Sequence, residues 1–128
     1  MGGNTYTGGT LLNSSAGLNF NNSHSFGTGL ITWGGAQQVL ADDLATAPIT
    51  LPNAMATRAA SQLIYVGPAV APVTFSGGWT LASGSSQLTI GDATHTSTKM
   101  TISGSISGSG GALVKDGVGT LVLSGSNT

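Results

Sequence analysis

Residues 73–81 read Val-Thr-Phe-Ser-Gly-Gly-Trp-Thr-Leu, in which two apolar–Thr–apolar triplets flank a Ser-Gly-Gly sequence. Successive side chains of a β-strand point to opposite faces of the sheet. Each triplet would therefore turn its two apolar side chains inward and its threonine outward. Glycine supplies the positive φ angles that tight corners need. The stretch predicts two short strands joined by a tight corner.

The same triplet recurs along the chain. Further copies are Ile31-Thr32-Trp33, Ile49-Thr50-Leu51, Leu88-Thr89-Ile90 and Met100-Thr101-Ile102, and Leu121-Val122-Leu123 repeats the form with a central valine. Short strands separated by short corners fit a β-sandwich or a β-solenoid. Asn-Gly and Asp-Gly turns are typical of antiparallel hairpins, and Asp116-Gly117 is the one dipeptide of that kind. This scarcity favours an all-β solenoid of parallel coils.

The composition limits the classes of function. Charged residues are 5% of the 128-residue chain and the net charge is −1, whereas an average domain has roughly 25% charged residues. Three scattered cations cannot form the basic patch that nucleic acid or an anionic membrane requires. No apolar stretch is long enough for membrane insertion. The hydrophobic fraction of 39% can still supply a core, so we expect one solenoid module over residues 1–128.

One segment has a different pattern. Gln37 to Leu44 combines helix-compatible residues with a partial i, i+3, i+4 apolar spacing, and Pro48 would end a helix there. The sequence therefore leaves open a short helix near residues 36–46, interrupting the coils.

The two ends of the chain belong to one motif. Residues 108–128 read GSGGALVKDGVGTLVLSGSNT, and residues 4–12 read NTYTGGTLL. Overlaying Asn127 on Asn4 joins them into a continuous phrase that resembles the autotransporter-associated β-strand repeat of bacterial surface and secreted proteins. The resemblance implies a right-handed parallel β-helix, exported from the cell or held at its surface, in a long repetitive protein.

The overlay sets a period of 123 residues, so the chain resembles one unit of a tandem array with uncapped ends. Coils of about 20 residues would give about six coils. Solenoids need polar terminal caps, and unprotected strand edges pair with other chains. We therefore expect head-to-tail stacking of copies into a filament, because such a contact does not close on itself. The expected N-terminal edge is Asn4, Tyr6, Thr10, Leu11 and Leu12. The expected C-terminal edge is Leu113, Val114, Leu121, Val122, Leu123 and Asn127.

The sequence thus predicts a structural module of an extracellular repeat protein or fibre whose partner is another copy of itself. A surface adhesin or glycan-binding module is the alternative, with Trp33 and Trp79 as sugar-stacking platforms. Exposure of both indoles would favour the adhesin, and burial of both would favour the structural role.

Catalysis is not expected. Asp42 and Asp43 are adjacent and would face opposite sides of a strand, and Asp92 with His95 fits a hydrogen-bonded corner better than a catalytic pair. A degenerate β-helix enzyme stays open only if carboxylates converge in a groove. His24 and His95, without glutamate or cysteine, predict no metal site, and no cofactor motif is present.

Overall fold

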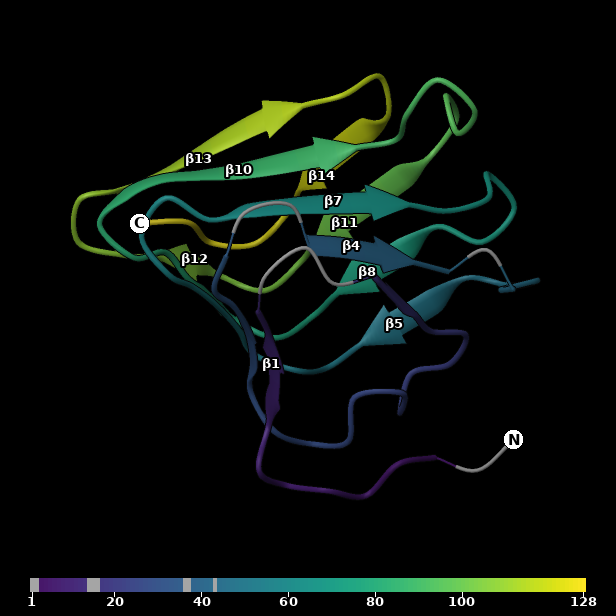
Figure 1. Ribbon diagram of the computed structural model, residues 1–128, viewed down its shortest axis with the longest axis horizontal. Helices are drawn as coiled ribbons and strands as arrows, with labels where there is room; N and C mark the ends of the chain where they lie inside the picture. Colours follow the sequence, from purple (N-terminus) through teal and green to yellow (C-terminus); the bar gives the residue numbers. More distant parts are fainter. Residues whose placement is uncertain (1–2, 14–16, 36–37, 43) are drawn as a thin grey trace.

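The chain forms a β-solenoid in which three parallel sheets, named A, B and C here, make the three sides. The structure, a computed structural model, describes residues 3–13, 17–35, 38–42 and 44–128. Every pairing between the described strands is parallel. In Figure 1 the coils rise from β1 near the bottom to β13 at the top. The predicted all-β, parallel-coil class is confirmed.

The described residues form fourteen strands that follow one another in the order A, B, C, except that the first coil has no described strand in sheet C. Sheet A contains β1 (Thr10–Leu12), β3 (Ile31–Trp33), β6 (Met55–Thr57), β9 (Trp79–Thr80) and β12 (Ile106–Ser107). Sheet B contains β2 (Gly17–Asn19), β4 (Gln38–Ala41), β7 (Gln62–Val66), β10 (Gly84–Ile90) and β13 (Gly111–Asp116). Sheet C contains β5 (Ile49–Leu51), β8 (Val73–Phe75), β11 (Lys99–Ile102) and β14 (Thr120–Leu123).

The coils are longer and fewer than the sequence predicted. Thr10 pairs with Ile31, 21 residues later, and Trp79 pairs with Ile106, 27 residues later. The five strands of sheet A therefore span four turns, instead of the expected six or so coils. The difference arises at the corners, which hold more residues than a coil of about 20 residues allows.

The segment near residues 36–46 contains a strand and, among its described residues, no helix. Strand β4 pairs with β2 on one side and with β7 on the other. Leu40 turns inward, where it is fully buried in register with Tyr65. Pairing on both edges and burial outweigh the helix propensity of this segment. Ala36, Gln37 and Asp43 lie outside the described residues.

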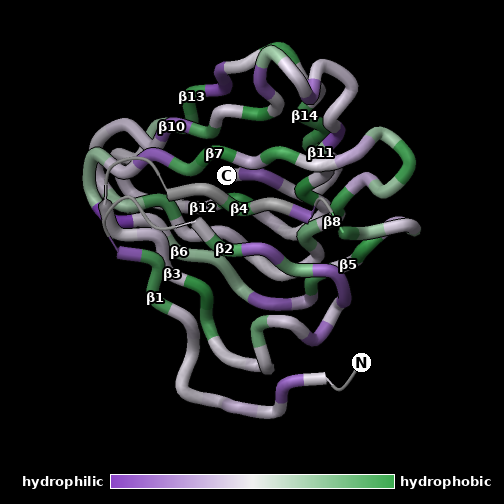
Figure 2. The backbone as a smooth tube through the Cα atoms, turned by 45° about the vertical axis from the view of Figure 1, so that its right-hand side comes forward, coloured by the Kyte–Doolittle hydropathy of each residue, from purple (hydrophilic) through white to green (hydrophobic). Residues whose placement is uncertain are grey.

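The core consists of apolar rows that run along the solenoid axis. Figure 2 shows hydrophobic segments recurring from coil to coil. In sheet A, one buried row is Ile31, Met55, Trp79 and Ile106. In sheet C, one buried row is Leu51, Phe75 and Ile102. The threonines between such residues point outward, as in the row Thr50, Thr74 and Thr101. The predicted inward and outward alternation of the triplets is confirmed.

Corner residues join each coil to the one below it. The buried amide Nδ2 of Asn53 donates hydrogen bonds to the carbonyl oxygens of Gly29 at 2.8 Å and Gly27 at 3.2 Å. Gly27 has a φ of +59°, and a Cβ there would lie 2.2 Å from the carbonyl oxygen of Tyr6. Only glycine fits this combination of left-handed backbone and close approach. At this corner the chain thus packs directly against the backbone of the coil below it.

Candidate assembly edges of the solenoid

The N-terminal edge consists of residues 4–12 together with β2. The Nδ2 of Asn4 donates to the Ser25 carbonyl at 2.8 Å, and the Thr28 N–H donates to the Tyr6 carbonyl at 3.0 Å. Residues 4–9 therefore lie along the corner of the first complete coil. This segment covers one corner of the coil and leaves the outer edges of β1 and β2 unpaired within the described chain.

The five residues predicted at this edge have different environments. Leu12 is 5% exposed and lies in the interior, in register with Trp33, while Leu11 turns outward and is 52% exposed. Thr10 lies in an interior row with Ile31, and its Oγ1 is 2.5 Å from the hydroxyl of Tyr6. Leu12 therefore belongs to the core, and the accessible apolar surface comes from Leu11 and the half-exposed Tyr6.

The C-terminal edge consists of β12, β13, β14 and Asn127. Leu121 and Leu123 continue two interior rows, in register with Met100 and Ile102. Ile102 is fully buried, yet Leu123 is 46% exposed. The difference arises because no described coil lies over β14. The core of the last coil is therefore open along the axis.

The other predicted residues of this edge divide between the two faces of the strands. Leu113 occupies an interior position in register with the buried Ser86. Val114 and Val122 point outward, in register with Gln87 and Thr101. The edge therefore presents three interior-row leucines, at positions 113, 121 and 123, and two outward valines.

Asn127 is held against the start of β12. The N–H of Ile106 donates to Asn127 Oδ1 at 3.0 Å, and the Thr128 N–H donates to the Ile106 carbonyl at 3.0 Å. In the coils below, the first residue of each sheet A strand donates instead to a backbone carbonyl, as Trp79 does to Ser105. Residues 127 and 128 thus lie where a further strand of sheet A would pair with β12. There Asn127 Oδ1 accepts the hydrogen bond that a backbone carbonyl oxygen accepts in the coils below.

Asn4 and Asn127, which the sequence overlay makes equivalent, contact different parts of the coil. Asn4 lies beside His24 and Ser25 on a corner, whereas Asn127 lies on the first residue of a sheet A strand. Both still bond the main chain of a neighbouring coil. Asn53 does the same inside the solenoid, and sequence reasoning missed it. Its position two residues before β6 is the signal that could have identified it.

Asp92 organises an exposed corner between β10 and β11. Its Oδ1 accepts hydrogen bonds from the Thr94 hydroxyl, the Thr94 N–H and the His95 N–H, each at 2.8 Å, and lies 2.8 Å from His95 Nδ1. The bonds from Thr94 and then from His95 hold the pKa of the Asp92 carboxyl well below its ordinary value. This is the hydrogen-bonded corner that the sequence favoured.

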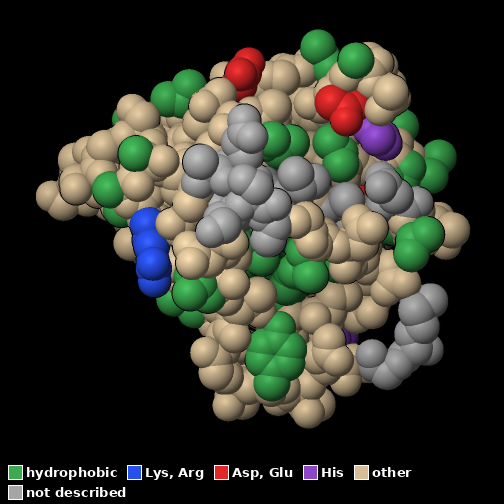
Figure 3. All heavy atoms as spheres, in the orientation of Figure 1, with side chains coloured by type: hydrophobic (Ala, Val, Ile, Leu, Met, Phe, Trp, Pro, Cys, Tyr) green, Lys and Arg blue, Asp and Glu red, His purple; other side chains and the backbone are tan. Residues whose placement is uncertain are grey.

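Charged side chains are sparse on the face of the molecule shown in Figure 3.

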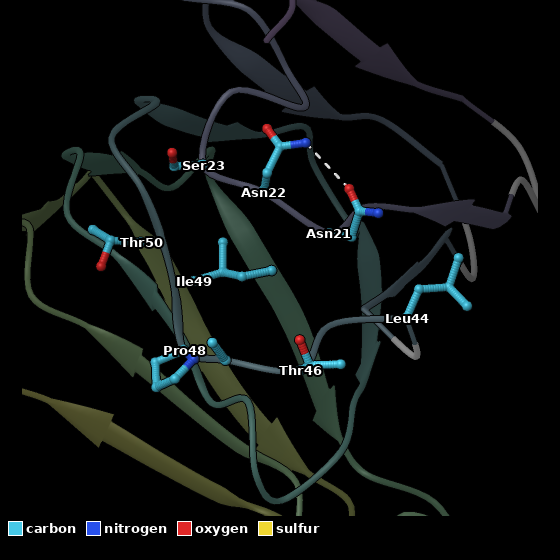
Figure 4. A pocket seen from close by; sticks show the side chains of 9 residues that line it. Asn21, Asn22, Ser23, Leu44, Thr46, Pro48, Ile49 and Thr50 are labelled. Carbon is cyan, nitrogen blue, oxygen red and sulfur yellow. Dashed lines mark hydrogen bonds between the residues drawn. The ribbon is translucent and has the colours of Figure 1, made fainter. Parts of the chain in front are cut away.

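A hollow of about 470 Å³ lies beside β5, where sheet C has no strand from the first coil. Its lining residues are Asn21, Asn22, Ser23, Leu44, Thr46, Ala47, Pro48, Ile49 and Thr50, none of them ionisable (Figure 4). The amide groups are already engaged: Asn22 Nδ2 donates to Asn21 Oδ1 at 3.1 Å, and the His24 N–H donates to Asn22 Oδ1 at 2.9 Å. The hollow therefore borders a folded turn whose polar groups bond one another.

Both tryptophans lie in the core. Trp33 is 0% exposed and Trp79 is 1% exposed, so neither indole can stack on a sugar at the surface.

Within the described ranges, no group of three or more His, Asp or Glu side chains could hold a metal ion. The described residues also include no helix long and apolar enough to cross a membrane. No protein-family model, curated protein or solved structure matches this chain.

Proposed function

We propose that this protein is a structural building block that stacks head to tail with copies of itself. The C-terminal edge of one copy meets the N-terminal edge of the next, and the parallel ladders of sheets A and B continue across the junction. The resemblance of residues 108–128 and 4–12 to an autotransporter-associated repeat supports a place in a bacterial extracellular or cell-surface fibre.

The observation that carries this proposal is the exposure of Leu123. Its row is buried at Leu51, Phe75 and Ile102 and becomes half-exposed only at the outermost coil. Covering this row removes apolar area from water, which stabilises association by roughly 25 cal/mol per Å². Because every pairing within the chain is parallel, a second copy extends the ladders only when it stacks in the same direction. That contact repeats without closing and produces a filament.

Sedimentation of the purified 128-residue chain over a range of concentrations tests the proposal, with negative-stain electron microscopy of the same samples. We expect mass to rise with concentration and filaments to form. Leu123→Asp and the milder Leu123→Ser should both shift the chain towards monomer, because they place a polar group in the row to be buried. Val70→Asp is the matched control, since Val70 is 70% exposed and lies between β7 and β8, away from both edges.

A wild-type chain that stays monomeric at the highest concentration would overturn the proposal. The same conclusion follows if both Leu123 variants assemble as the wild type does. Far-UV circular dichroism of each variant confirms that the β-structure is retained.

A further inference from the structure

Lys115 occupies an interior row at the C-terminal edge. The register of sheet B aligns it with Leu88 of β10 and, one coil further down, with Leu63 of β7. Both leucines are 0% exposed. The cation therefore stands at the open end of a row that is purely apolar in the two coils beneath it.

The charge of Lys115 has no carboxylate facing it. Asp116, the next residue, points to the opposite face of the strand, where its Oδ2 accepts a bond from Gln87 Nε2 at 3.0 Å. No ionisable residue lies in β10, which pairs with β13, or in β12 and β14, which precede and follow β13 in the sequence. Lys115 Nζ donates to the carbonyl of Gly117, which is neutral. Lys115 is exposed at this open end, where solvent can satisfy the other donors of its ammonium group.

The N-terminal edge, residues 4–12 and β2, also contains no carboxylate side chain. The first acidic residue in the sequence is Asp42, and it is buried in the second coil, where it accepts a bond from the Tyr65 hydroxyl at 3.0 Å. A second copy stacked on β13 would therefore take the Lys115 ammonium out of water without offering an opposite charge. Burying an unpaired ion costs more than its contacts return.

We propose that Lys115 limits the strength of head-to-tail stacking by placing a charge in a row that the junction must bury. This inference rests on the proposed function. An inward-pointing charge on an edge strand is one of the ways in which proteins restrain edge-to-edge pairing. The leucines of the edge favour the contact, and Lys115 opposes it, so that stacking needs a high local concentration of copies.

Lys115→Met tests this inference against Lys99→Met. Both changes remove one positive charge and leave the same net charge. Lys99 is exposed on the outward face of β11, beside the inward Met100. We expect Lys115→Met to lower the concentration for half-maximal assembly about tenfold or more. Lys99→Met should match the wild type, and Lys115→Arg, which keeps the charge, should not strengthen assembly.

The outcomes separate the two proposals. If the wild type assembles and Lys115→Met assembles no more strongly than Lys99→Met, the inference about Lys115 is wrong and stacking stands. Weaker assembly of Lys115→Met also overturns the inference, because the lysine would then contribute to the contact. If the wild type assembles at no concentration, head-to-tail stacking itself is wrong, whatever Lys115→Met does, and the inference that rests on it falls with it.

Discussion

The indole rings of Trp33 and Trp79 meet edge to face, with their centroids 4.9 Å apart and their planes at 79°. The two residues belong to β3 and β9, which are separated in sheet A by β6. Phe75 adds a second edge-to-face contact with Trp79, at 5.4 Å and 82°. Such aromatic pairs contribute about 0.5–1.5 kcal/mol beyond the area that they bury. The rings thus connect two coils that share no strand pairing.

Trp33→Phe should destabilise the fold. The buried Trp33 Nε1 donates to Ser61 Oγ at 2.7 Å, and phenylalanine removes that donor while leaving the Ser61 hydroxyl buried. We expect a loss of about 1–3 kcal/mol in the free energy of unfolding, measured by urea denaturation. Thr80→Ala, an outward change on the same sheet, should stay within about 0.5 kcal/mol of the wild type. An unchanged midpoint for Trp33→Phe would show that the bond contributes nothing.

Asn53→Asp should be more damaging than Asn53→Ala. The Asn53 amide donates to the carbonyls of Gly27 and Gly29 in the coil below. Alanine removes the donor, at a cost of about 1–3 kcal/mol, whereas aspartate keeps the shape but places acceptor oxygens against those carbonyls. Hydrogen exchange checks this locally, because amide exchange over residues 26–31 should accelerate most in Asn53→Asp. Equal exchange in the two variants would contradict the assigned role of the amide donor.

Gly67→Ala should disturb the contact between Asp42 and Tyr65. A Cβ at position 67 would lie 1.8 Å from Asp42 Oδ1 and 2.7 Å from the Tyr65 hydroxyl. Overpacking of this kind typically costs about 1–3 kcal/mol, and thermal unfolding measures it. Gly17→Ala in β2 is the matched control, because no atom lies within 4 Å of a Cβ there. If both variants melted together, the close approach at Gly67 would have no energetic weight.

The contribution of Asp92 should depend on pH. Hydrogen bonds from Thr94 and His95 lower the pKa of its carboxyl in the folded state, while the unfolded chain has an ordinary value of about 3.9. The folded state therefore gains stability above that unfolded value and loses it as the pH falls towards the lower, folded pKa. Melting curves should show Asp92→Asn less stable than the wild type at pH 7, with the difference shrinking below about pH 4. A difference that stays constant down to pH 2 would contradict this linkage.

The triplets were the most informative part of the sequence. The strands containing Ile31, Ile49, Val73 and Met100 follow the predicted alternation, because threonine between two large apolar residues suits a half-buried strand. Sheet B was harder to predict. Lys115 stands at an interior position of β13, and β4 has residues that are compatible with a helix. In such segments, pairing with neighbouring coils decides the structure.

The candidate edges were predictable as segments but not residue by residue. The motif at residues 108–128 placed β13 and β14 at one end of the chain, yet it could not show that Leu12 is buried or that Lys115 continues an apolar row. Those facts depend on the register between coils. The register depends on corner lengths, which vary from coil to coil and have no repeating sequence signal.

The succession of sheets A, B and C pairs the strands of each coil only with those of the coils before and after it in sequence. Insertion of one extra coil of about 24 residues, the separation of Met55 and Trp79, would lengthen the molecule by one strand spacing of about 4.8 Å. Away from the point of insertion, the rows would keep their contacts. Such a chain can change its length by duplication of internal segments without a new fold, since its stability is close to a sum over coils and their interfaces.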